Sequence, residues 1–307
     1  MSYNLIKKKL ENKEVIILDG SMGAELEKKG AHMDKNLWCG KCSIDSPELV
    51  KKVHQEYIDA GADIITTNTY ATTPISMRQH GLSESIEEYN QVSVKIAQDA
   101  VKDSGKDVAV AGSVSTFGNF YKFGTKAMIP GFNEQLSILS NSGVDLIILE
   151  AMSSQADIVE TIIECSTKIN IPVWLSISCV IDEKNQKVML GYNDTIDKDT
   201  QVYEDLDVSI SNFSKIHAGP ILIAHSDISV TGDAIKNAKK NFKGILGAYP
   251  NKGYYEKPHW KFVDDITPNE YLEKAKNWVK DGAQIIGGCC GVGPDFIKPL
   301  SKLKNQQ

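Results

Sequence analysis

The stretch SPELVKKVHQEYIDAGADIITTNTY, residues 46–70, contains one complete helix-to-strand unit. Ser46 precedes a proline and is placed to cap a helix, and Glu48 in the first turn favours the positive end of the helix dipole. Gly61 predicts the end of that helix, since glycine readily adopts the left-handed conformation found there. The apolar run 63–70 follows directly and is typical of a parallel strand buried on both faces.

The same alternation recurs along the whole chain. Eight nearly continuous apolar runs are each followed by a segment with helical periodicity, at residues 15–20, 63–70, 107–115, 145–152, 173–180, 220–226, 244–251 and 283–291. Eight strand-helix units predict an α/β fold, specifically a (β/α)8 TIM barrel. We see no interdomain linker, so residues 1–307 are expected to form a single domain. Thr267 and Glu270 also predict a capping box at a later helix start.

Composition narrows the classes of function. The 307 residues include 41% hydrophobic residues and carry a net charge of -6, with Lys and Arg scattered among Asp and Glu. This pattern argues against a nucleic-acid partner, which would favour a basic stripe. The stretch 1–14 has no apolar core of signal-peptide length and no run approaches the ~20 apolar residues of a membrane span, so we expect a cytoplasmic protein without a membrane partner. Its six cysteines are expected to be reduced thiols that pack or bind metal.

Polar residues gather where the predicted strands end, which in a barrel is the face that carries the active site. They are Asp19, Asn68, Ser113, Glu150, Cys179, His225, Asn251, Cys289 and Cys290. A carboxylate at the top of a barrel strand is costly to bury without a partner or a ligand, which makes Asp19 and Glu150 candidates for binding. The alternative for either one is a salt bridge that closes the rim.

The stretch GGCCGVGP, residues 287–294, places two adjacent cysteines among glycines. Neighbouring side chains of a strand face opposite ways, so Cys289 and Cys290 can share one face only if the backbone leaves strand geometry, which the glycines permit. Packing and metal binding are equal alternatives for this pair. His225 ends the sixth strand on the same rim; it is either a metal ligand or a hydrogen-bonded core histidine.

Motifs along nearly the whole chain resemble those of the homocysteine S-methyltransferase family. They are ILDGSMGAELEKKG at 17–30, PELVKKVHQEYIDAGADIITTNTY at 47–70, SISC at 176–179, YPNKG at 249–253 and GGCCG at 287–291. Members of this family are (β/α)8 barrels whose zinc ion activates the thiol of homocysteine. The resemblance therefore implies a Zn²⁺-dependent methyltransferase that makes methionine, with no catalytic residue required beyond the zinc site.

The resemblance implies that Cys289 and Cys290 are zinc ligands. The family's third ligand is a cysteine at the end of strand six, usually within Gly-x-Asn-Cys, whereas this sequence reads ILIAHSDIS at 221–229. Counting back without gaps from the following helix puts His225 in that place, and a shift of one residue would put Ser226 there. Two thiolates and a neutral imidazole on Zn²⁺ sum to zero charge, whereas three thiolates sum to -1, so a bound substrate thiolate should form more readily and be less nucleophilic.

The resemblance also implies how an amino-acid thiol would bind. The expected contacts are Asp19 and Glu150 with the ammonium, the backbone amides of Gly20, Ser21 and Met22 with the carboxylate, and hydrogen bonds from Asn68 and Ser113. The expected donor is a small sulfonium or ammonium compound, although Ala71 and Ala151 stand where betaine-using members place aromatic residues. Three alternatives remain open: a different thiol acceptor, a methylated corrinoid protein as donor, and a non-catalytic barrel that binds an amino acid or zinc. The sequence leaves the oligomeric state open.

Overall fold

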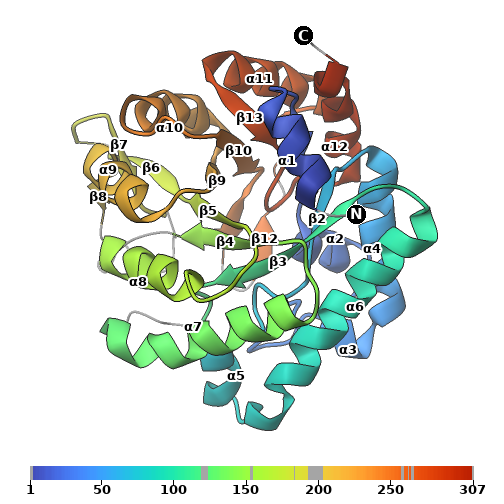
Figure 1. Ribbon diagram of the computed structural model, residues 1–307. Coiled ribbons are helices and arrows are strands. Elements are labelled where there is room, and N and C mark those ends of the chain that lie inside the picture. The colour runs from blue at the N-terminus through green and yellow to red at the C-terminus, as the bar shows by residue number, and fades with distance from the viewer. Residues whose placement is uncertain are drawn as a thin grey trace.

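The core of the fold is a parallel sheet, which Figure 1 shows in a computed structural model. The structure describes residues 3–118, 124–152, 155–182, 184–192, 203–256, 259–261, 263 and 266–305, and within these ranges the sheet has eight strands. They are β1 (Ile16–Ile17), β2 (Ile64–Thr66), β3 (Ala109–Ser115), β4 (Leu146–Met152), β5 (Val173–Ile177), β9 (Ile221–Asp227), β10 (Leu246–Asn251) and β13 (Ala283–Ile286). Seven of the eight predicted runs contain one of these strands, and β9 extends one residue beyond its run 220–226, so the predicted strand positions are confirmed.

The sheet closes on itself. Its order is β1-β13-β10-β9-β5-β4-β3-β2, and an isolated parallel bridge between Leu18 and Ile64 joins the two ends of that order. The amide of Asp19 donates to the carbonyl of Ile64 at 3.0 Å, and the amide of Asp63 donates to the carbonyl of Ile17 at 2.7 Å. The predicted (β/α)8 barrel is therefore confirmed.

Helices surround the barrel in the order that the sequence predicts (Figure 1). The outer helices are α4 (Pro47–Ala60), α6 (Ile86–Ser104), α7 (Gly124–Asn141), α8 (Ala156–Ser166), α9 (Leu206–Ile216), α10 (Ile228–Asn241), α11 (Pro268–Asp281) and α12 (Pro294–Leu300). Two short helices precede α4, namely α2 (Met22–Lys28) and α3 (Cys42–Asp45), and η3 (Ser301–Asn305) follows α12. The other short elements lie between the outer helices: α5 (Pro74–Gln79), η1 (Ser83–Ser85), the strands β6 (Cys179–Asp182), β7 (Lys187–Leu190) and β8 (Glu204–Asp205), and the hairpin of β11 (Tyr254–Glu256) and β12 (His259–Lys261).

The two predicted helix caps have different outcomes. Thr267 forms the full capping box with Glu270, as predicted. Ser46 precedes α4 but makes no side-chain cap, so that prediction is wrong. The reason is the preceding element, because Ser46 also ends α3 and its amide donates to the carbonyl of Cys42 at 2.9 Å. Gly61 ends α4 in the left-handed conformation, with φ of 102°, as predicted.

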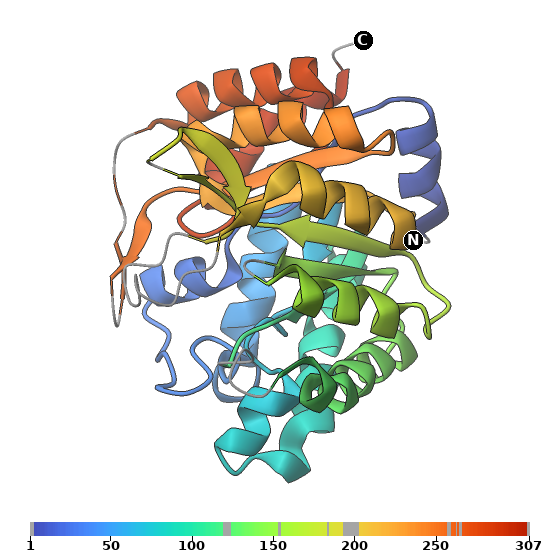
Figure 2. The ribbon, with the colours of Figure 1, turned by 90° about the vertical axis from the view of Figure 1, so that its left-hand side faces the viewer.

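One end of the barrel is filled by apolar side chains. Trp174 of β5 is fully buried and shares a cluster with small residues of neighbouring strands, such as Ala109 and Ala224. The helix α1 (Tyr3–Glu11) covers this end, and Tyr3 accepts a hydrogen bond from the indole of Trp174 at 3.1 Å. Figure 2 shows α1, in blue, at the opposite end of the barrel from the β11–β12 hairpin. Among the described residues, apolar side chains therefore fill the amino-terminal end of the barrel, opposite the carboxyl ends of the strands.

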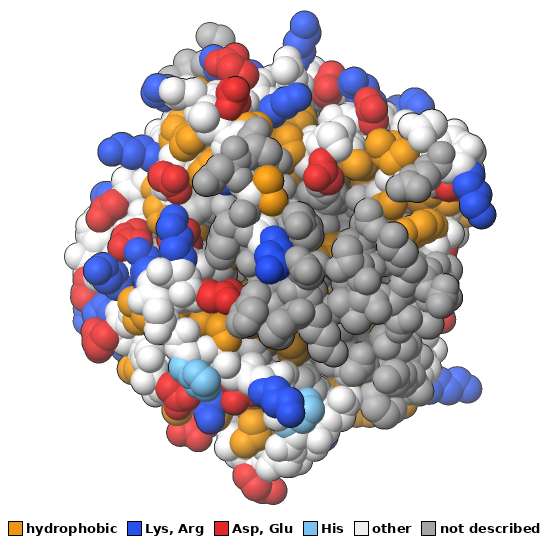
Figure 3. Space-filling model, turned by 180° about the vertical axis from the view of Figure 1, so that it is seen from behind, with side chains coloured by type: hydrophobic (Ala, Val, Ile, Leu, Met, Phe, Trp, Pro, Cys, Tyr) orange, Lys and Arg blue, Asp and Glu red, His pale blue; other side chains and the backbone are white. Residues whose placement is uncertain are grey.

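The described surface shows mixed charge. On the face opposite to α1, lysine and arginine side chains lie among aspartate and glutamate side chains in the part that is described (Figure 3). None of the helices within the described ranges combines the length and apolar composition that crossing a membrane requires.

His54 is a polar residue inside the layer between the barrel and its helices. It lies on α4, is fully buried, and neither ring nitrogen has a hydrogen-bond partner among the described residues. Burial lowers the pKa of His54 to about 3, from an ordinary value of 6.5. The folded protein therefore keeps this imidazole neutral, whereas the unfolded chain protonates it as the pH falls below 6.5.

We predict that His54 makes the fold sensitive to mild acid. Between about pH 7.5 and about pH 5 this side chain should lower the free energy of unfolding by about 2 kcal/mol, because only the unfolded chain takes up the proton. Urea unfolding of wild type and His54→Leu at both pH values measures the difference in pH dependence. The exposed His80, replaced by Gln, provides the control and should leave that dependence unchanged. Equal pH dependence in wild type and His54→Leu would contradict the prediction.

Candidate metal and substrate site

A cavity of about 720 Å³ opens at the carboxyl ends of the barrel strands. Nine of the ten residues that the sequence analysis assigned to metal or substrate line this cavity. They are Asp19, Gly20, Ser21, Met22, Asn68, Glu150, His225, Cys289 and Cys290. Ser113 does not line it. The structure thus brings residues from both ends of the chain and from its middle into one space.

The adjacent cysteines lie in a loop that begins as soon as β13 ends. The loop leaves strand geometry, as predicted, and both sulfurs face the same space near His225. Among the flanking glycines, Gly291 has a positive φ of 80°, which favours glycine. Gly288 is needed for space, because a Cβ there would lie 2.1 Å from a methyl carbon of Val292. Glycine therefore serves this loop through close packing as well as through backbone freedom.

His225 lies next to both sulfurs. Its Nδ1 is 3.5 Å from the Sγ of Cys289 and 4.0 Å from the Sγ of Cys290. The neighbouring Ser226, which a one-residue shift would favour, points elsewhere: its hydroxyl donates to the carbonyl of Ala224 and accepts from the amide of Cys179, each at 2.8 Å. Of the two residues, only His225 is brought to the cysteine pair.

These three side chains fit the requirements of a zinc ion. One ligand atom from each of them lies within 4.8 Å of the other two. A tetrahedral zinc site with bonds of about 2.3 Å to sulfur and about 2.1 Å to nitrogen needs a sulfur-to-nitrogen separation of about 3.6 Å. The contact with Cys290 and burial raise the pKa of Cys289, so two thiolates at this position require a nearby cation. The donor set is therefore suited to a thiophilic divalent metal.

Two carboxyl groups face the cavity without a lysine or arginine partner in the described part of the chain. Asp19 is buried and accepts hydrogen bonds from the amide of Thr66 at 2.6 Å and from its hydroxyl at 2.9 Å. Burial raises the pKa of Asp19 to about 8, and Glu150 adds to this shift. Burial also raises the pKa of Glu150. The rim salt bridge that the sequence left as an alternative is thus not observed for either residue among the described residues.

The loop after β1 presents backbone groups to the cavity. Gly20, Ser21 and Met22 all line it, and Ser21 caps α2 by accepting a hydrogen bond from the amide of Ala24 at 3.1 Å. The amide of Ser21 itself donates to the carbonyl of Val292 at 3.1 Å. One of the three amides expected to meet a substrate carboxylate is therefore already engaged.

Asn68 and Ser113 occupy supporting positions. The amide group of Asn68 donates to the carbonyl of Cys39 at 2.9 Å and to the hydroxyl of Ser43 at 3.1 Å. Ser113 is fully buried behind Glu150 and donates its hydroxyl to that carboxylate. Both side chains orient the wall of the cavity, and Ser113 reaches the cavity only through Glu150.

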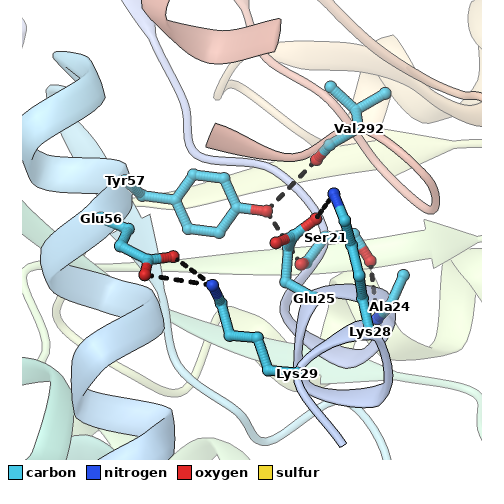
Figure 4. A network of polar contacts seen from close by, with 8 residues as sticks. All are labelled: Ser21, Ala24, Glu25, Lys28, Lys29, Glu56, Tyr57 and Val292. Carbon is cyan, nitrogen blue, oxygen red and sulfur yellow. Dashed lines mark hydrogen bonds and ion pairs between the residues drawn. The ribbon is translucent and has the colours of Figure 1, made fainter. Parts of the chain in front are cut away.

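Tyr57 ties the first and last loops of the barrel together. Its buried hydroxyl lies 2.9 Å from the carbonyl of Ser21 and 3.2 Å from that of Val292, and it donates to both (Figure 4). Gly20 sits beneath this contact, and a Cβ there would lie 2.2 Å from the Val292 oxygen and 2.9 Å from the Tyr57 oxygen. The loop after β1 is therefore held at a fixed distance from the cysteine loop.

Several lining residues escaped the sequence analysis. Thr66 holds Asp19, and the threonine pair at 66–67, in the middle of the second apolar run, was the signal that could have revealed it. Tyr192 stacks on the imidazole of His225, with ring centroids 4.4 Å apart and planes inclined by 19°, and no sequence motif marks it. The aromatic side chains that line the cavity are Trp38, Tyr70, Phe117, Tyr192 and Tyr249.

Comparisons with known proteins identify the family of this chain. The family model described as homocysteine S-methyltransferase matches residues 16–303. Homocysteine S-methyltransferase 3 of Zea mays is 30% identical over 95% of this chain and 90% of its own length. A selenocysteine methyltransferase of Astragalus bisulcatus is 27% identical, over 94% of this chain and 91% of its own length.

Among solved structures, the metallated form of the homocysteine methyltransferase MmuM from Escherichia coli has the same fold. Its TM-score is 0.75 at 22% sequence identity, and the match covers 97% of this chain and 99% of that one. The match of the family model over most of the chain, together with the Zea mays relative, confirms the resemblance drawn from the motifs. The chain belongs to the homocysteine S-methyltransferase family.

Proposed function

We propose that the protein is a zinc-dependent S-methyltransferase that moves a methyl group from a small sulfonium or ammonium donor to the thiol of homocysteine, giving methionine. Family membership supports the reaction class. The observation that carries the proposal is the convergence of His225, Cys289 and Cys290 at the cavity. We also propose that residues 1–307 act as one domain, because the eight strands that build the cavity run from β1 to β13.

In this proposal His225, Cys289 and Cys290 would hold the zinc next to the bound acceptor thiol. When bound, the metal supplies a Lewis acid that lowers the pKa of a coordinated thiol, so that the reactive thiolate exists at neutral pH. The protein residues orient the acceptor so that its sulfur forms a bond to the methyl carbon while the donor's carbon–sulfur or carbon–nitrogen bond breaks. The bonding electron pair leaves with the donor, and no protein nucleophile is required.

The amino-acid part of the acceptor would bind to the loop after β1 and to the two carboxyl groups. Asp19 and Glu150 would pair with the substrate ammonium, which in a buried cavity needs a counter-ion. The amides of Gly20 and Met22, which flank the α2 cap residue Ser21, would meet the carboxylate. Ser113 would act through Glu150, because its hydroxyl donates to that side chain.

The aromatic lining supports a cationic donor. Trp38, Tyr70 and Phe117 line the cavity, and the ring of Tyr70 packs edge-to-face on that of Phe117 with centroids 5.9 Å apart. Sulfonium and quaternary ammonium groups are attracted to the faces of such rings. Ala71 and Ala151 stand where betaine-using members place aromatic residues. In this chain a cationic donor would therefore contact other aromatic side chains of the cavity. The donor within this cationic class stays open.

A second candidate concerns the acceptor. Two relatives are named as methyltransferases of selenocysteine, at 27% and 28% identity. A zinc site of the same kind would activate a selenol as it does a thiol. Acceptors other than homocysteine therefore belong in the assay, as does a methylated corrinoid protein as an alternative donor.

We predict that the purified protein binds one zinc ion per chain. His225→Ala should lose this zinc, because two thiolates without the imidazole leave the metal incompletely held. Ser226→Ala serves as the control for the neighbouring position and should retain it. Metal analysis after dialysis against a weak chelator measures both variants. Wild-type protein without stoichiometric zinc, even after loading, would refute the proposed mechanism.

We predict that zinc-loaded protein forms methionine from homocysteine with at least one cationic donor. S-Methylmethionine, betaine and S-adenosylmethionine are the donors to compare, with methionine measured by mass spectrometry. Selenocysteine as the acceptor tests the second candidate. Failure of every donor with homocysteine, in protein that holds zinc, would show that the proposed acceptor or donor class is wrong.

We predict that Glu150→Gln raises the KM for homocysteine by at least about tenfold while zinc content stays unchanged, because the substrate ammonium loses a charged partner. The acceptor 4-mercaptobutyrate, which is homocysteine without its amino group, makes the test specific. Wild type should strongly prefer homocysteine over this analogue, and Glu150→Gln should lose most of that preference. The exposed Glu88, replaced by Gln, is the control. An unchanged preference in Glu150→Gln would assign the ammonium to other groups.

A further inference from the structure

A histidine at the metal site has a requirement that a cysteine does not. A thiolate presents its sulfur whatever its rotation about the last side-chain bond, whereas an imidazole presents a nitrogen only when its ring plane is correctly set. In this structure the Nδ1 edge of His225 faces both sulfurs and the Oδ1 of Asn251, the latter at 3.1 Å. Some part of the protein must therefore hold the plane of this ring.

The ring of Tyr192 covers one face of that imidazole. The two centroids are 4.4 Å apart and the planes are inclined by 19°, which is a stacked arrangement. Tyr192 follows the hairpin of β6 and β7, an insertion between the fifth barrel strand and α9. The aromatic contact therefore comes from outside the barrel's repeating units.

A residue next to each of the two stacked rings forms a hydrogen bond with the same short segment, residues 178–179. The amide of Gly191, next to Tyr192, donates to the carbonyl of Ser178 at 3.0 Å. The hydroxyl of Ser226, next to His225, accepts from the amide of Cys179 at 2.8 Å. Because residues 178 and 179 are neighbours, both stacked rings are anchored to the same point of the chain.

We propose that Tyr192 is a positioning residue that fixes the imidazole plane of His225 and so preorganises its Nδ1 to hold zinc with Cys289 and Cys290. This inference rests on the proposed zinc site. In this proposal the hairpin insertion supplies the residue that orients the His225 ring. A cysteine at position 225 would have no ring and would not need this contact. Partners that orient a metal ligand typically contribute tenfold to hundredfold in metal affinity.

The test is a comparison of zinc dissociation constants, measured by competition with a chromogenic chelator. Tyr192→Phe keeps the ring and should bind zinc within about twofold of wild type. Tyr192→Leu and Tyr192→Ala remove the ring and should weaken binding at least about tenfold. Phe117→Leu, which alters another aromatic residue of the same cavity, should leave zinc affinity unchanged. Thermal unfolding of each metal-free variant checks that the fold is retained.

Repeating the Tyr192 substitution in a His225→Cys protein distinguishes a positioning role of Tyr192 from a general structural role. In His225→Cys, which keeps a competent ligand without a ring, Tyr192→Leu should change zinc affinity by no more than about twofold. Unchanged affinity in both ring-removing variants of the wild type would overturn the inference, as would an equal loss in the His225→Cys background. A wild-type protein that binds no zinc would instead refute the proposed function.

Discussion

The parallel pairing of β1 with β13 is the contact on which the site depends. Ile17 lies opposite Ile286, and the amide of Leu18 donates to the carbonyl of Ile286 at 2.8 Å. Beyond the strands, the amide of Gly288 donates to the carbonyl of Asp19 at 3.1 Å. The two ends of the chain are thereby joined backbone to backbone, and the loop with Asp19 cannot move independently of the loop with the cysteines. This pairing therefore supports both the loop with Asp19 and the loop with Cys289 and Cys290, which carry the residues proposed to bind the amino acid and the metal.

Local departures from strand geometry occur at His225 and next to Glu150. His225 has a φ of 49°, and the pairing of β9 with β10 shifts its register between Tyr249 and Asn251. Ala151, directly after Glu150, has a φ of 53° in a similar irregularity of β4. Residues other than glycine adopt this conformation at a cost of about 1–3 kcal/mol each, which the surrounding barrel must offset. Such irregularities redirect side chains at the rims of barrels and next to active sites, and here they flank a carboxylate and an imidazole that both line the cavity.

The strands and most of the site could be predicted because the repeating unit is regular. Each apolar run became a strand, and strand ends converge by the geometry of the fold, so Asp19, Glu150 and His225 were found from position alone. Ser113 was expected to hydrogen-bond the substrate, and pattern alone does not reveal that its hydroxyl donates to Glu150. Tyr192 was missed because it follows an inserted hairpin that the repeat does not contain. The Ser46 cap failed because α3 ends where α4 begins, a junction that only the three-dimensional backbone defines.

The ionisable groups of the site share one electrostatic tendency. Burial raises the pKa values of Asp19 and Glu150, and the contact with Cys290 together with burial raises that of Cys289, so in each case the surroundings disfavour the charged form. An arriving ammonium or metal ion would reverse that preference by stabilising the charged forms, and the displaced protons would leave to solvent. In the proposed function, cation binding in this cavity would therefore be coupled to proton release and would weaken as the pH falls, because protons compete for the same atoms. With a neutral imidazole as the third ligand, the proposed metal site carries no net charge, and the negative charge that remains lies with the carboxyl groups on the amino-acid side of the cavity.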